Sequence, residues 1–277
     1  MIYEIILLSV GLKREVELIQ AVVLDLDGTL LDHHHQIPPL NRDVLNALKE
    51  KGVRIYIATG RTFLSMKPYY DQLNLDTPAI SYNGAKVVYN DGRIEESGLT
   101  HQQVHFLIEL SQTHQIHLNV YKDEKWYTNA SLSQWAKEYA QISGLTPVHV
   151  DWTDLSDYSS TKTLFLGHRP DLLKLVPLIQ DRCGQEVHTT SSKPQFLEVL
   201  KAGVHKGSAI QKVMAQDGID LKDVIAFGDG LNDLEMLQTV GMGIAMENGF
   251  DELKQVAVDI APSHQQAGVG QYLKRYL

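Results

Sequence analysis

A short apolar run that ends in two carboxylates constrains the fold of this chain more than any other feature. Residues 20–26 read QAVVLDL and lead directly into Asp27, Gly28 and Thr29. A continuous apolar run of this length is typical of a strand buried in a parallel sheet. Gly28 lets the chain bend into a loop, because glycine has no Cβ. The pattern predicts a buried parallel strand whose carboxyl end carries Asp25 and Asp27.

Helical and extended patterns alternate on either side of the chain's middle. Leu40, Val44, Leu45 and Leu48 recur at helical spacing before Gly52, which predicts an amphipathic helix over residues 41–51. The other segments that we expect are strands at 53–58, 79–82, 224–227 and 242–245 and helices at 63–73, 206–216, 231–238, 250–257 and 268–276. This order predicts an α/β fold with a doubly wound, mostly parallel sheet.

The middle of the chain follows a different pattern. Residues 86–95 are expected to form a hairpin around the turn Asn90-Asp91-Gly92. Helices are expected near 101–115 and 131–142, mixed with strands at 116–121, 162–167 and 196–200. We therefore expect a catalytic core of residues 1–85 and 191–277, interrupted by an α+β insert of residues 86–190.

Composition narrows the classes of partner. Of the 277 residues, 25 are Lys or Arg and 34 are Asp or Glu, so the formal charge of −9 argues against a nucleic-acid partner. Cys183 is the only cysteine, which rules out an intrachain disulfide and suits the cytoplasm. Residues 1–10 are apolar apart from Glu4 and Ser9 and too short to span a bilayer, so no signal peptide or membrane anchor is expected. The role of residues 1–20 and the oligomeric state stay open.

Four short polar segments fall at predicted strand ends or helix starts. They are residues 25–29 (DLDGT), 59–61 (TGR), 206–207 (KG) and 228–233 (GDGLND). In an open parallel sheet, ligands bind in the crevice at the carboxyl ends of the strands. We therefore expect the four segments to meet in one site.

Asp25 and Asp27 suit the two carboxylate roles in phosphoryl transfer. That reaction needs an in-line nucleophile, a proton donor for the leaving oxygen and positive charge on the equatorial oxygens. We expect ionised Asp25 to attack phosphorus, and Asp27 to protonate the leaving group and later deprotonate water. Two carboxylates so close repel each other, which should raise the pKa of one and help to keep it protonated as the acid.

A divalent cation is expected beside these carboxylates, because an anionic nucleophile and an anionic phosphate repel each other. Oxygen-rich ligation suits Mg²⁺, with Asp229 binding directly and Asp233 holding a metal-bound water. Lys206 supplies a positive charge and Thr59 a hydroxyl for the phosphoryl group. The backbone amides of Leu26 and Gly60 are the further donors.

These segments resemble the haloacid dehalogenase-like superfamily, and among its members the Cof-like phosphatases with a subclass IIB cap. The resemblance covers the chain from about Gln20 to its C-terminal end. It implies Asp25 as nucleophile, Asp27 as acid/base, and Mg²⁺ held by Asp25, the Asp27 carbonyl and Asp229. It also implies that residues 81–85 (SYNGA), which include Asn83 and Gly84, often face substrate, and that Asn232 contacts the phosphate or supports a residue that does. Arg61 is a further candidate for binding phosphate or substrate. His205 stands where relatives often have Ser.

Hydrolysis of a small phosphorylated metabolite, such as a sugar phosphate or a phosphorylated cofactor, is the leading hypothesis. A phosphomutase on the same scaffold is the nearest alternative. A receiver-like signalling module also combines strand-end aspartates, Thr, Lys and Mg²⁺, but it has no need of Asp27 as a proton shuttle.

Two groups of residues stay outside this chemistry. His33-His34-His35 follows the first motif, and we interpret it as a solvated loop near the mouth of the site, since consecutive loop side chains rarely face one ion. In the insert, Lys162, Trp126 and Trp152 could be packing, solvated or substrate-binding residues.

Overall fold

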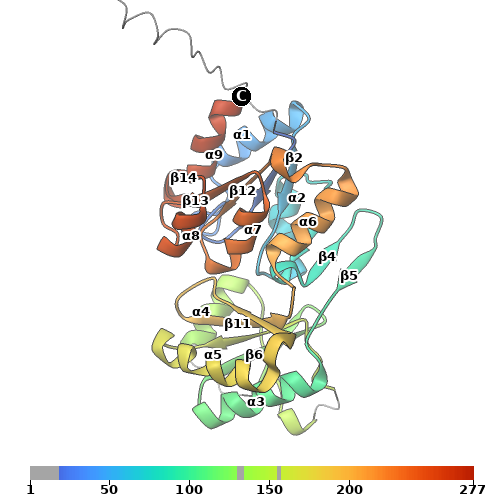
Figure 1. Ribbon diagram of the computed structural model, residues 1–277, viewed down its shortest axis with the longest axis vertical. Helices are drawn as coiled ribbons and strands as arrows, with labels where there is room; N and C mark the ends of the chain where they lie inside the picture. Colours follow the sequence, from blue (N-terminus) through green and yellow to red (C-terminus); the bar gives the residue numbers. More distant parts are fainter. Residues whose placement is uncertain (1–18, 130–133, 155–156) are drawn as a thin grey trace, which may run out of the picture.

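The computed structural model describes residues 19–129, 134–154 and 157–277, so the expected role of residues 1–18 lies outside the described part of the chain. Figure 1 shows two lobes that are joined by extended segments. The upper lobe contains β1, β2 and β12–β14, and the lower lobe contains β6, β11 and α3–α5. None of the helices within the described residues is long and apolar enough to cross a membrane.

The upper lobe is built on a parallel sheet of five strands in the order β14-β13-β12-β1-β2. Its strands are β1 (Ala21–Leu24), β2 (Arg54–Ile57), β12 (Val224–Gly228), β13 (Met242–Met246) and β14 (Asp259–Ala261). Every pair in this sheet is parallel, and Ala21 lies opposite Arg54 on one side and Val224 on the other. A parallel bridge between Ala58 and Ile80 continues the sheet toward β3 (Ala79–Ser81).

Helices cover both faces of this sheet, because each strand presents apolar side chains to both sides. The helices are α1 (Pro39–Glu50), α2 (Phe63–Gln72), α6 (Lys206–Asp217), α7 (Leu234–Thr239), α8 (Asp251–Val256) and α9 (Gly268–Leu273). Val22 and Leu24 pack in one core cluster with residues of α1, α2 and α9. Ala21 and Val23 pack in a second cluster with residues of α6, α7 and α8. The predicted doubly wound α/β fold is confirmed.

The ends of α1 and α6 follow local sequence signals. α1 has Pro39 at its first position and buries Val44, Leu45 and Leu48, as the helical spacing predicts. It ends before Gly52, whose φ of 87° suits glycine. α6 begins at Lys206 because the ring of His205 accepts a hydrogen bond from the Ser208 amide and caps the helix.

The lower lobe holds a sheet of six strands in the order β10-β11-β9-β6-β7-β8. Its strands are β6 (His117–Lys122), β7 (Lys125–Thr128), β8 (Val148–His149), β9 (Lys162–Leu166), β10 (Val187–Thr190) and β11 (Phe196–Lys201). α3 (His101–His114) and α5 (Arg169–Cys183) pack on one face around Phe165. α4 (Gln134–Ser143) packs on the other face, which is the face turned toward the upper lobe in Figure 1. Residues 131–133 of the expected helix lie outside the described residues.

Strand pairing differs from the predicted domain boundaries at both junctions. β4 (Lys86–Val88) and β5 (Ile94–Glu96) form the expected hairpin, but β4 pairs with β3, so the hairpin extends from the core. β11 pairs with β9 and β10, so residues 196–201 lie in the sheet of the insert and not in the core, where the predicted boundary at 191 put them. The division into a core and an insert stays a prediction. The pairing moves the inserted part to about residues 97–202.

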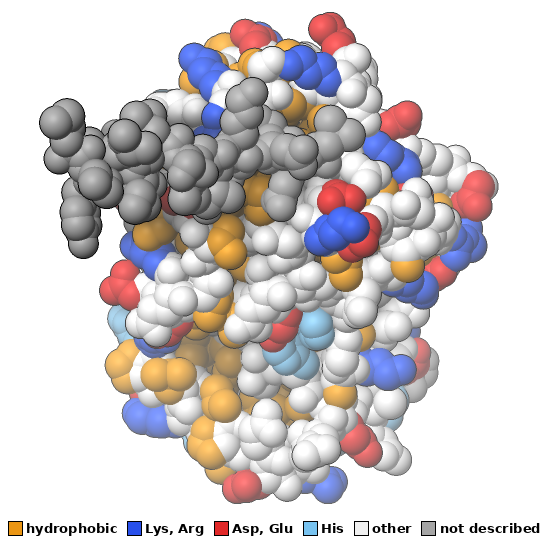
Figure 2. Space-filling model, turned by 45° about the horizontal axis from the view of Figure 1, so that its top comes forward, with side chains coloured by type: hydrophobic (Ala, Val, Ile, Leu, Met, Phe, Trp, Pro, Cys, Tyr) orange, Lys and Arg blue, Asp and Glu red, His pale blue; other side chains and the backbone are white. Residues whose placement is uncertain are grey.

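The remaining elements are single helical turns. They are η1 (Tyr82–Gly84), η2 (Trp152–Asp154), η3 (Gly184–Glu186), η4 (Leu221–Asp223), η5 (Leu231–Asp233), η6 (His264–Gln266) and η7 (Lys274–Tyr276). η5 forms the start of the helix expected at 231–238, and η7 the end of the one expected at 268–276. On the face shown in Figure 2, acidic and basic side chains are interspersed over the described residues and do not gather into a basic band.

Candidate active site

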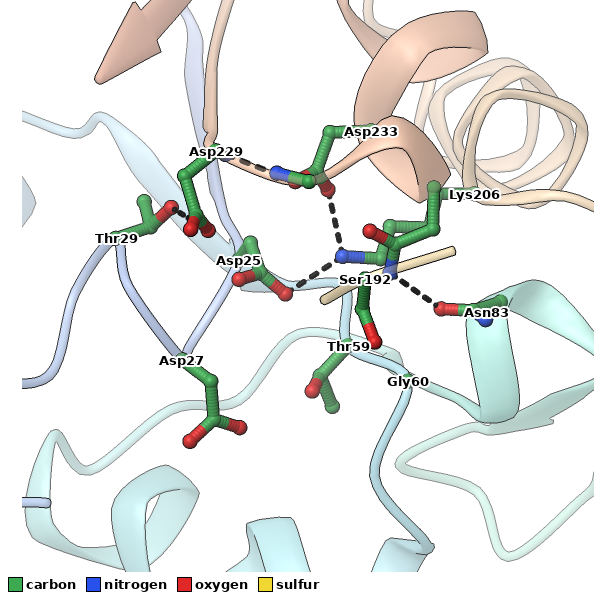
Figure 3. Close-up of polar contacts among 12 residues, drawn as sticks. Asp25, Asp27, Thr29, Thr59, Gly60, Asn83, Ser192, Lys206, Asp229 and Asp233 are labelled. Atoms are coloured by element: carbon green, nitrogen blue, oxygen red, sulfur yellow. Dashed lines mark hydrogen bonds and ion pairs between the residues drawn. The ribbon is translucent and has the colours of Figure 1, made fainter. Parts of the chain in front are cut away.

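The four predicted segments converge at the carboxyl end of the five-stranded sheet (Figure 3). Asp25 follows β1 directly, Thr59 lies two residues beyond β2, and Asp229 follows β12. Lys206 is the first residue of α6, which approaches from one face of the sheet. The expectation that these segments share one site rested on strand topology, and the structure shows that arrangement.

Lys206 is the centre of the charge arrangement. Its side chain is fully buried, and its Nζ lies 2.6 Å from Oδ1 of Asp25 and 2.6 Å from Oδ1 of Asp233. Burial by itself would lower the pKa of Lys206, but the carboxylates of Asp233 and Asp25 outweigh burial and raise the pKa. The ammonium group therefore stays charged and fixes one oxygen of Asp25, which leaves Oδ2 of Asp25 for other contacts.

Asp25, Asp229 and Asp233 form an acidic cluster that suits a cation. One carboxylate oxygen from each lies within 4.8 Å of the others. Burial raises the pKa of Asp25 to about 7, although Lys206 opposes the rise. Burial, followed by the charges of Asp25 and Asp233, raises the pKa of Asp229 well above its usual value. A divalent cation held by oxygen ligands would remove this repulsion, so the donor set fits the expected metal.

Gly28 and Thr29 set the position of the Asp229 carboxylate. Thr29 Oγ1 donates a hydrogen bond of 3.2 Å to Oδ1 of Asp229. Gly28 has φ +84°, and a Cβ at this position would lie 2.2 Å from Oδ2 of Asp229. The DLDGT segment therefore needs glycine for its backbone conformation and for the close approach of Asp229.

Asp233 has hydrogen-bond partners on both oxygens. Its Oδ2 accepts hydrogen bonds of 2.9 Å from the backbone amides of Asp229 and Gly230, while its Oδ1 accepts from Lys206. These contacts hold the 228–233 loop in shape. The expectation that Asp233 holds a metal-bound water stays a prediction, and loop organisation is the role that the hydrogen bonds support directly.

Asp27 differs from the expectation for a protonated acid. Its carboxylate points away from the Lys206 cluster in Figure 3. Arg61 binds it through both oxygens, with Nε to Oδ2 at 2.6 Å and Nη2 to Oδ1 at 2.7 Å. Burial would raise the pKa of Asp27, but the hydrogen bonds from Arg61 and His35 outweigh burial and hold the pKa well below its usual range. The raised pKa falls on Asp25 instead, so the expectation of a protonated Asp27 is wrong for this state of the site.

The histidine run is exposed at His33 and His34 and lies at the mouth of the site, as interpreted from the sequence, and His35 reaches further in than a solvated loop residue would. Its Nδ1 lies 3.4 Å from Oδ1 of Asp27, and its carbonyl oxygen accepts a hydrogen bond from Tyr69. His35 has φ 56°, a left-handed conformation that turns the chain back toward Asp27. The local signal for this turn is weak: histidine adopts the left-handed conformation more often than most residues, and Asp32 Oδ1 accepts hydrogen bonds from the amides of His34 and Gln36.

None of residues 81–85 lines the cavity. Asn83 Oδ1 accepts a hydrogen bond of 2.9 Å from Asn232 Nδ2, and Asn83 Nδ2 donates one of 2.8 Å to Glu198. Gly84 has φ +93°, and a Cβ there would lie 2.6 Å from the carbonyl oxygen of His205. The glycine therefore lets this turn pack against the start of α6. Asn232 lines the cavity, whereas Asn83 and Gly84 are absent from its lining, so their predicted contact with substrate is not supported here.

A cavity between the lobes lies over these groups. Its core side is formed by Asp25, Asp27, Thr59, Gly60, Arg61, Thr62, Ser65 and Asn232, and its insert side by Tyr139, Ile142, Ser143, Lys162, Leu164, Ser192, Lys193, Phe196 and Glu198. Leu26 is fully buried beneath it, between the two aspartates in sequence. Of the three insert residues singled out from the sequence, only Lys162 lines the cavity, since Trp126 and Trp152 pack in the two core clusters of the lower lobe. The other insert residues had no motif or spacing that could have identified them.

Comparison with known proteins gives consistent results over nearly the whole chain. A model of the haloacid dehalogenase-like hydrolase family matches residues 22–273. A Haemophilus influenzae protein named as a candidate phosphatase is 32% identical over 263 residues, which cover 92% of this chain and 96% of that protein. An HMP-PP phosphatase from Serratia proteamaculans is 31% identical over 258 residues, which cover 91% of this chain and 93% of that protein.

Solved structures show the same architecture. A haloacid dehalogenase-like hydrolase from Bacteroides thetaiotaomicron has a TM-score of 0.82 at 27% identity, and the match covers 94% of this chain and 100% of that one. A sugar phosphatase of subclass IIB has a TM-score of 0.80 at 20% identity over 93% of this chain and 98% of that one. The second likeness concerns the fold alone.

The chain therefore belongs to the haloacid dehalogenase-like hydrolases. Within that family it is a phosphatase of the Cof-like group, in agreement with its curated relatives and with the fold of subclass IIB members. The family and the enzyme class expected from the four motif segments are confirmed.

Proposed function

We propose that the protein is a Mg²⁺-dependent phosphatase that hydrolyses small phosphomonoesters through a phosphoryl-aspartate on Asp25. The observation that carries this proposal is the position of Asp25. Its carboxylate lies at the floor of the cavity, with one oxygen bound to the buried Lys206 and with Asp229 within reach of the same cation. Asp25 thus lies between the cavity that it lines and the buried charges of Lys206, Asp229 and Asp233 behind it.

In the first half of the reaction, the free oxygen of Asp25 forms a bond to phosphorus while the bond from phosphorus to the leaving oxygen breaks. Thr59 and the amides of Gly60 and Leu26 are assigned as donors to the phosphoryl oxygens, with Lys206 and Asn232 as further donors. Mg²⁺ held by Asp25, Asp229 and the carbonyl of Asp27 would neutralise charge on the phosphoryl group. Water then attacks phosphorus, phosphate leaves, and the Asp25 carboxylate is regenerated.

Asp27 is assigned to the proton transfers. As the acid it gives its proton to the leaving oxygen, and as the base it later takes a proton from the attacking water. The observed ion pair with Arg61 supports the ionised form, which is the form a base needs. Binding of the ester must therefore weaken the Arg61 contact before Asp27 can carry the proton of the first step.

The substrate is proposed to be a small phosphorylated metabolite in the cytoplasm. The insert covers the site, and the cavity combines apolar walls at Tyr139, Leu164 and Phe196 with charged groups at Lys162 and Glu198. The relative named as an HMP-PP phosphatase acts on a small phosphorylated molecule. No nucleic acid is proposed as a partner, since the net charge is −9.

Phosphate release tests this proposal. The purified protein is incubated with Mg²⁺ and a panel of sugar phosphates, nucleotides and phosphorylated vitamins, and free phosphate is measured beside formation of phosphate isomers. Asp25→Asn should abolish release, whereas Asp43→Asn, at an exposed carboxylate on α1, should not change it. Retained turnover in Asp25→Asn would reject the nucleophile, and isomer formation without phosphate release would favour a mutase.

A further inference from the structure

A buried ion pair in the wall of the cavity lies outside the residues assigned to phosphoryl transfer. Lys162 in β9 and Glu198 in β11 are 3% and 2% exposed, and Nζ of Lys162 lies 2.5 Å from Oε2 of Glu198. A buried pair of this kind is weak evidence for a contribution to stability, because the loss of hydration offsets the attraction. The contacts of the pair indicate what else it does, since each member reaches a different motif segment of the core.

The Lys162 side of the pair acts on the segment that carries Thr59. Nζ of Lys162 donates a hydrogen bond of 2.7 Å to the carbonyl oxygen of Gly60. That carbonyl belongs to the same peptide group as the N–H of Arg61, which donates a hydrogen bond of 3.2 Å to Thr59 Oγ1. Thr59 Oγ1 thus accepts from the backbone through one of its lone pairs, and its single O–H proton is free to point into the cavity. By holding this peptide plane, Lys162 fixes the direction in which Thr59 can donate.

The Glu198 side of the pair acts on the segment that carries Asn232. Oε2 of Glu198 accepts a hydrogen bond of 2.8 Å from Asn83, and Asn83 Oδ1 accepts one of 2.9 Å from Asn232. Ser192 donates to the other Glu198 oxygen at 2.8 Å. Asn83 has φ 56° and follows Tyr82, which has φ 52°. Two successive left-handed residues without glycine persist only where the surroundings hold them, and Glu198 supplies part of that hold.

We propose that Lys162 and Glu198 act together as a positioning pair, which makes the orientation of Thr59 and Asn232 depend on the seating of the insert over the core. The inference rests on the proposed function, because Thr59 and Asn232 are assigned there to the phosphoryl group. Neither Lys162 nor Glu198 takes part in bond making. Their effect passes through the Gly60–Arg61 peptide and through Asn83.

The first test is Lys162→Met, with p-nitrophenyl phosphate as the substrate. Its small leaving group depends little on contacts with the insert. Misplacement of catalytic groups by about 1 Å can reduce turnover about 10²-fold, so kcat should fall on that order with little change in KM. Lys125→Met, at an exposed lysine in the same six-stranded sheet, is the matched control and should leave both constants unchanged. An increase in KM alone would mean that Lys162 only contacts substrate, and it would overturn the proposal.

The second test asks whether Lys162 acts through Thr59. In a Thr59→Ala background the hydroxyl is absent, so adding Lys162→Met should reduce kcat further by no more than about twofold, the usual error of additivity. If the loss in kcat is as large in that background as in the wild type, the two residues act independently and the proposal fails.

A second variant covers the risk that Lys162→Met does not fold. Lys162→Met combined with Glu198→Gln removes both charges and leaves an oxygen to accept from Asn83, and replacement of a buried pair is often neutral for stability. The same loss in kcat and the same dependence on Thr59 are expected. Failure of both variants to fold would show that the pair is a structural requirement and would overturn the proposal. The proposed function itself would be refuted if the wild type shows no turnover, or if Asp25→Asn retains turnover.

Discussion

Replacement of Asp25 by asparagine should make the metal-free protein more stable, although it removes the proposed nucleophile. In the native state burial raises the pKa of Asp25 from 3.8 to about 7, so the charged form is disfavoured there relative to the unfolded chain. Each unit of pKa corresponds to about 1.4 kcal/mol, so the ionised carboxylate reduces the free energy of unfolding by about 4 kcal/mol at pH 8. Asparagine is uncharged at every pH and resembles the protonated acid in shape.

The sign of the pH dependence follows from proton binding. Between pH 4 and pH 7 the native protein binds more protons at Asp25 than the unfolded chain does, so the stability of the wild type falls as pH rises. The advantage of Asp25→Asn should therefore be about 4 kcal/mol at pH 8 and decline to about 2 kcal/mol at pH 5, where the native wild type is mostly protonated at this position.

Urea denaturation in the presence of EDTA measures this difference at the two pH values. Asp43→Asn in α1 serves as the control, because its carboxylate is 68% exposed and its removal should change stability little at either pH. A variant Asp25→Asn that is less stable than the wild type at pH 8 without metal would refute the reasoning. It would mean that the attraction of Lys206 outweighs the burial of Asp25 and its repulsion by Asp233.

Three further predictions concern the proposed metal site, the pKa of Asp27 and the turn at Gly84. Mg²⁺ should raise the Tm of the wild type and raise it much less in Asp229→Asn, because the acidic cluster loses a ligand; equal shifts in thermal denaturation would exclude Asp229 from the metal site. Arg61→Met should raise the pKa of Asp27, so the limb of the pH profile of kcat that requires ionised Asp27 should move to higher pH. If that limb does not move, the ionisation of Asp27 does not determine the pH dependence of kcat. Gly84→Ala should lower the free energy of unfolding by more than the ~1–2 kcal/mol expected of a left-handed alanine, because its Cβ would also meet the His205 carbonyl. Gly92→Ala, with φ +85° and open space around it, isolates the backbone part, and equal losses in urea denaturation would contradict the packing argument.

The elements and residues that the sequence predicted well share one property, which is that short-range pattern determines them. Asp25 and Asp229 each follow a buried apolar strand, and the carboxyl ends of parallel strands meet at one edge of the sheet. Lys206 begins the helix expected at 206–216, and it is the first residue of α6. For these residues, the spacing in the sequence and the topology of the sheet leave little freedom.

The misplaced elements depend on partners that are distant in sequence. Phe196–Lys201 is recognisable as a strand, but whether it pairs with the core or with the insert depends on β9, which is 30 residues or more away. His35 depends on a left-handed turn for which its residue type is only a weak signal. The residues on the insert side of the cavity, such as Glu198 and Ser192, recur at no fixed spacing in the sequence, because they come from separate strands and loops.

The electrostatics of the two aspartates show why a correct motif can still give a wrong protonation state. Asp25 and Asp27 are two residues apart, and their mutual repulsion is the only effect on their pKa values that the sequence shows. The structure adds two larger effects, which are the burial of Asp25 and the pairing of Asp27 with Arg61, 34 residues further along the chain. Because a bidentate guanidinium contact stabilises the ionised carboxylate more than a neighbouring anion disfavours it, the low pKa falls on Asp27. The motif therefore specifies which two carboxylates lie at the end of β1, whereas the residues that close the site around them decide which of the two carries a proton.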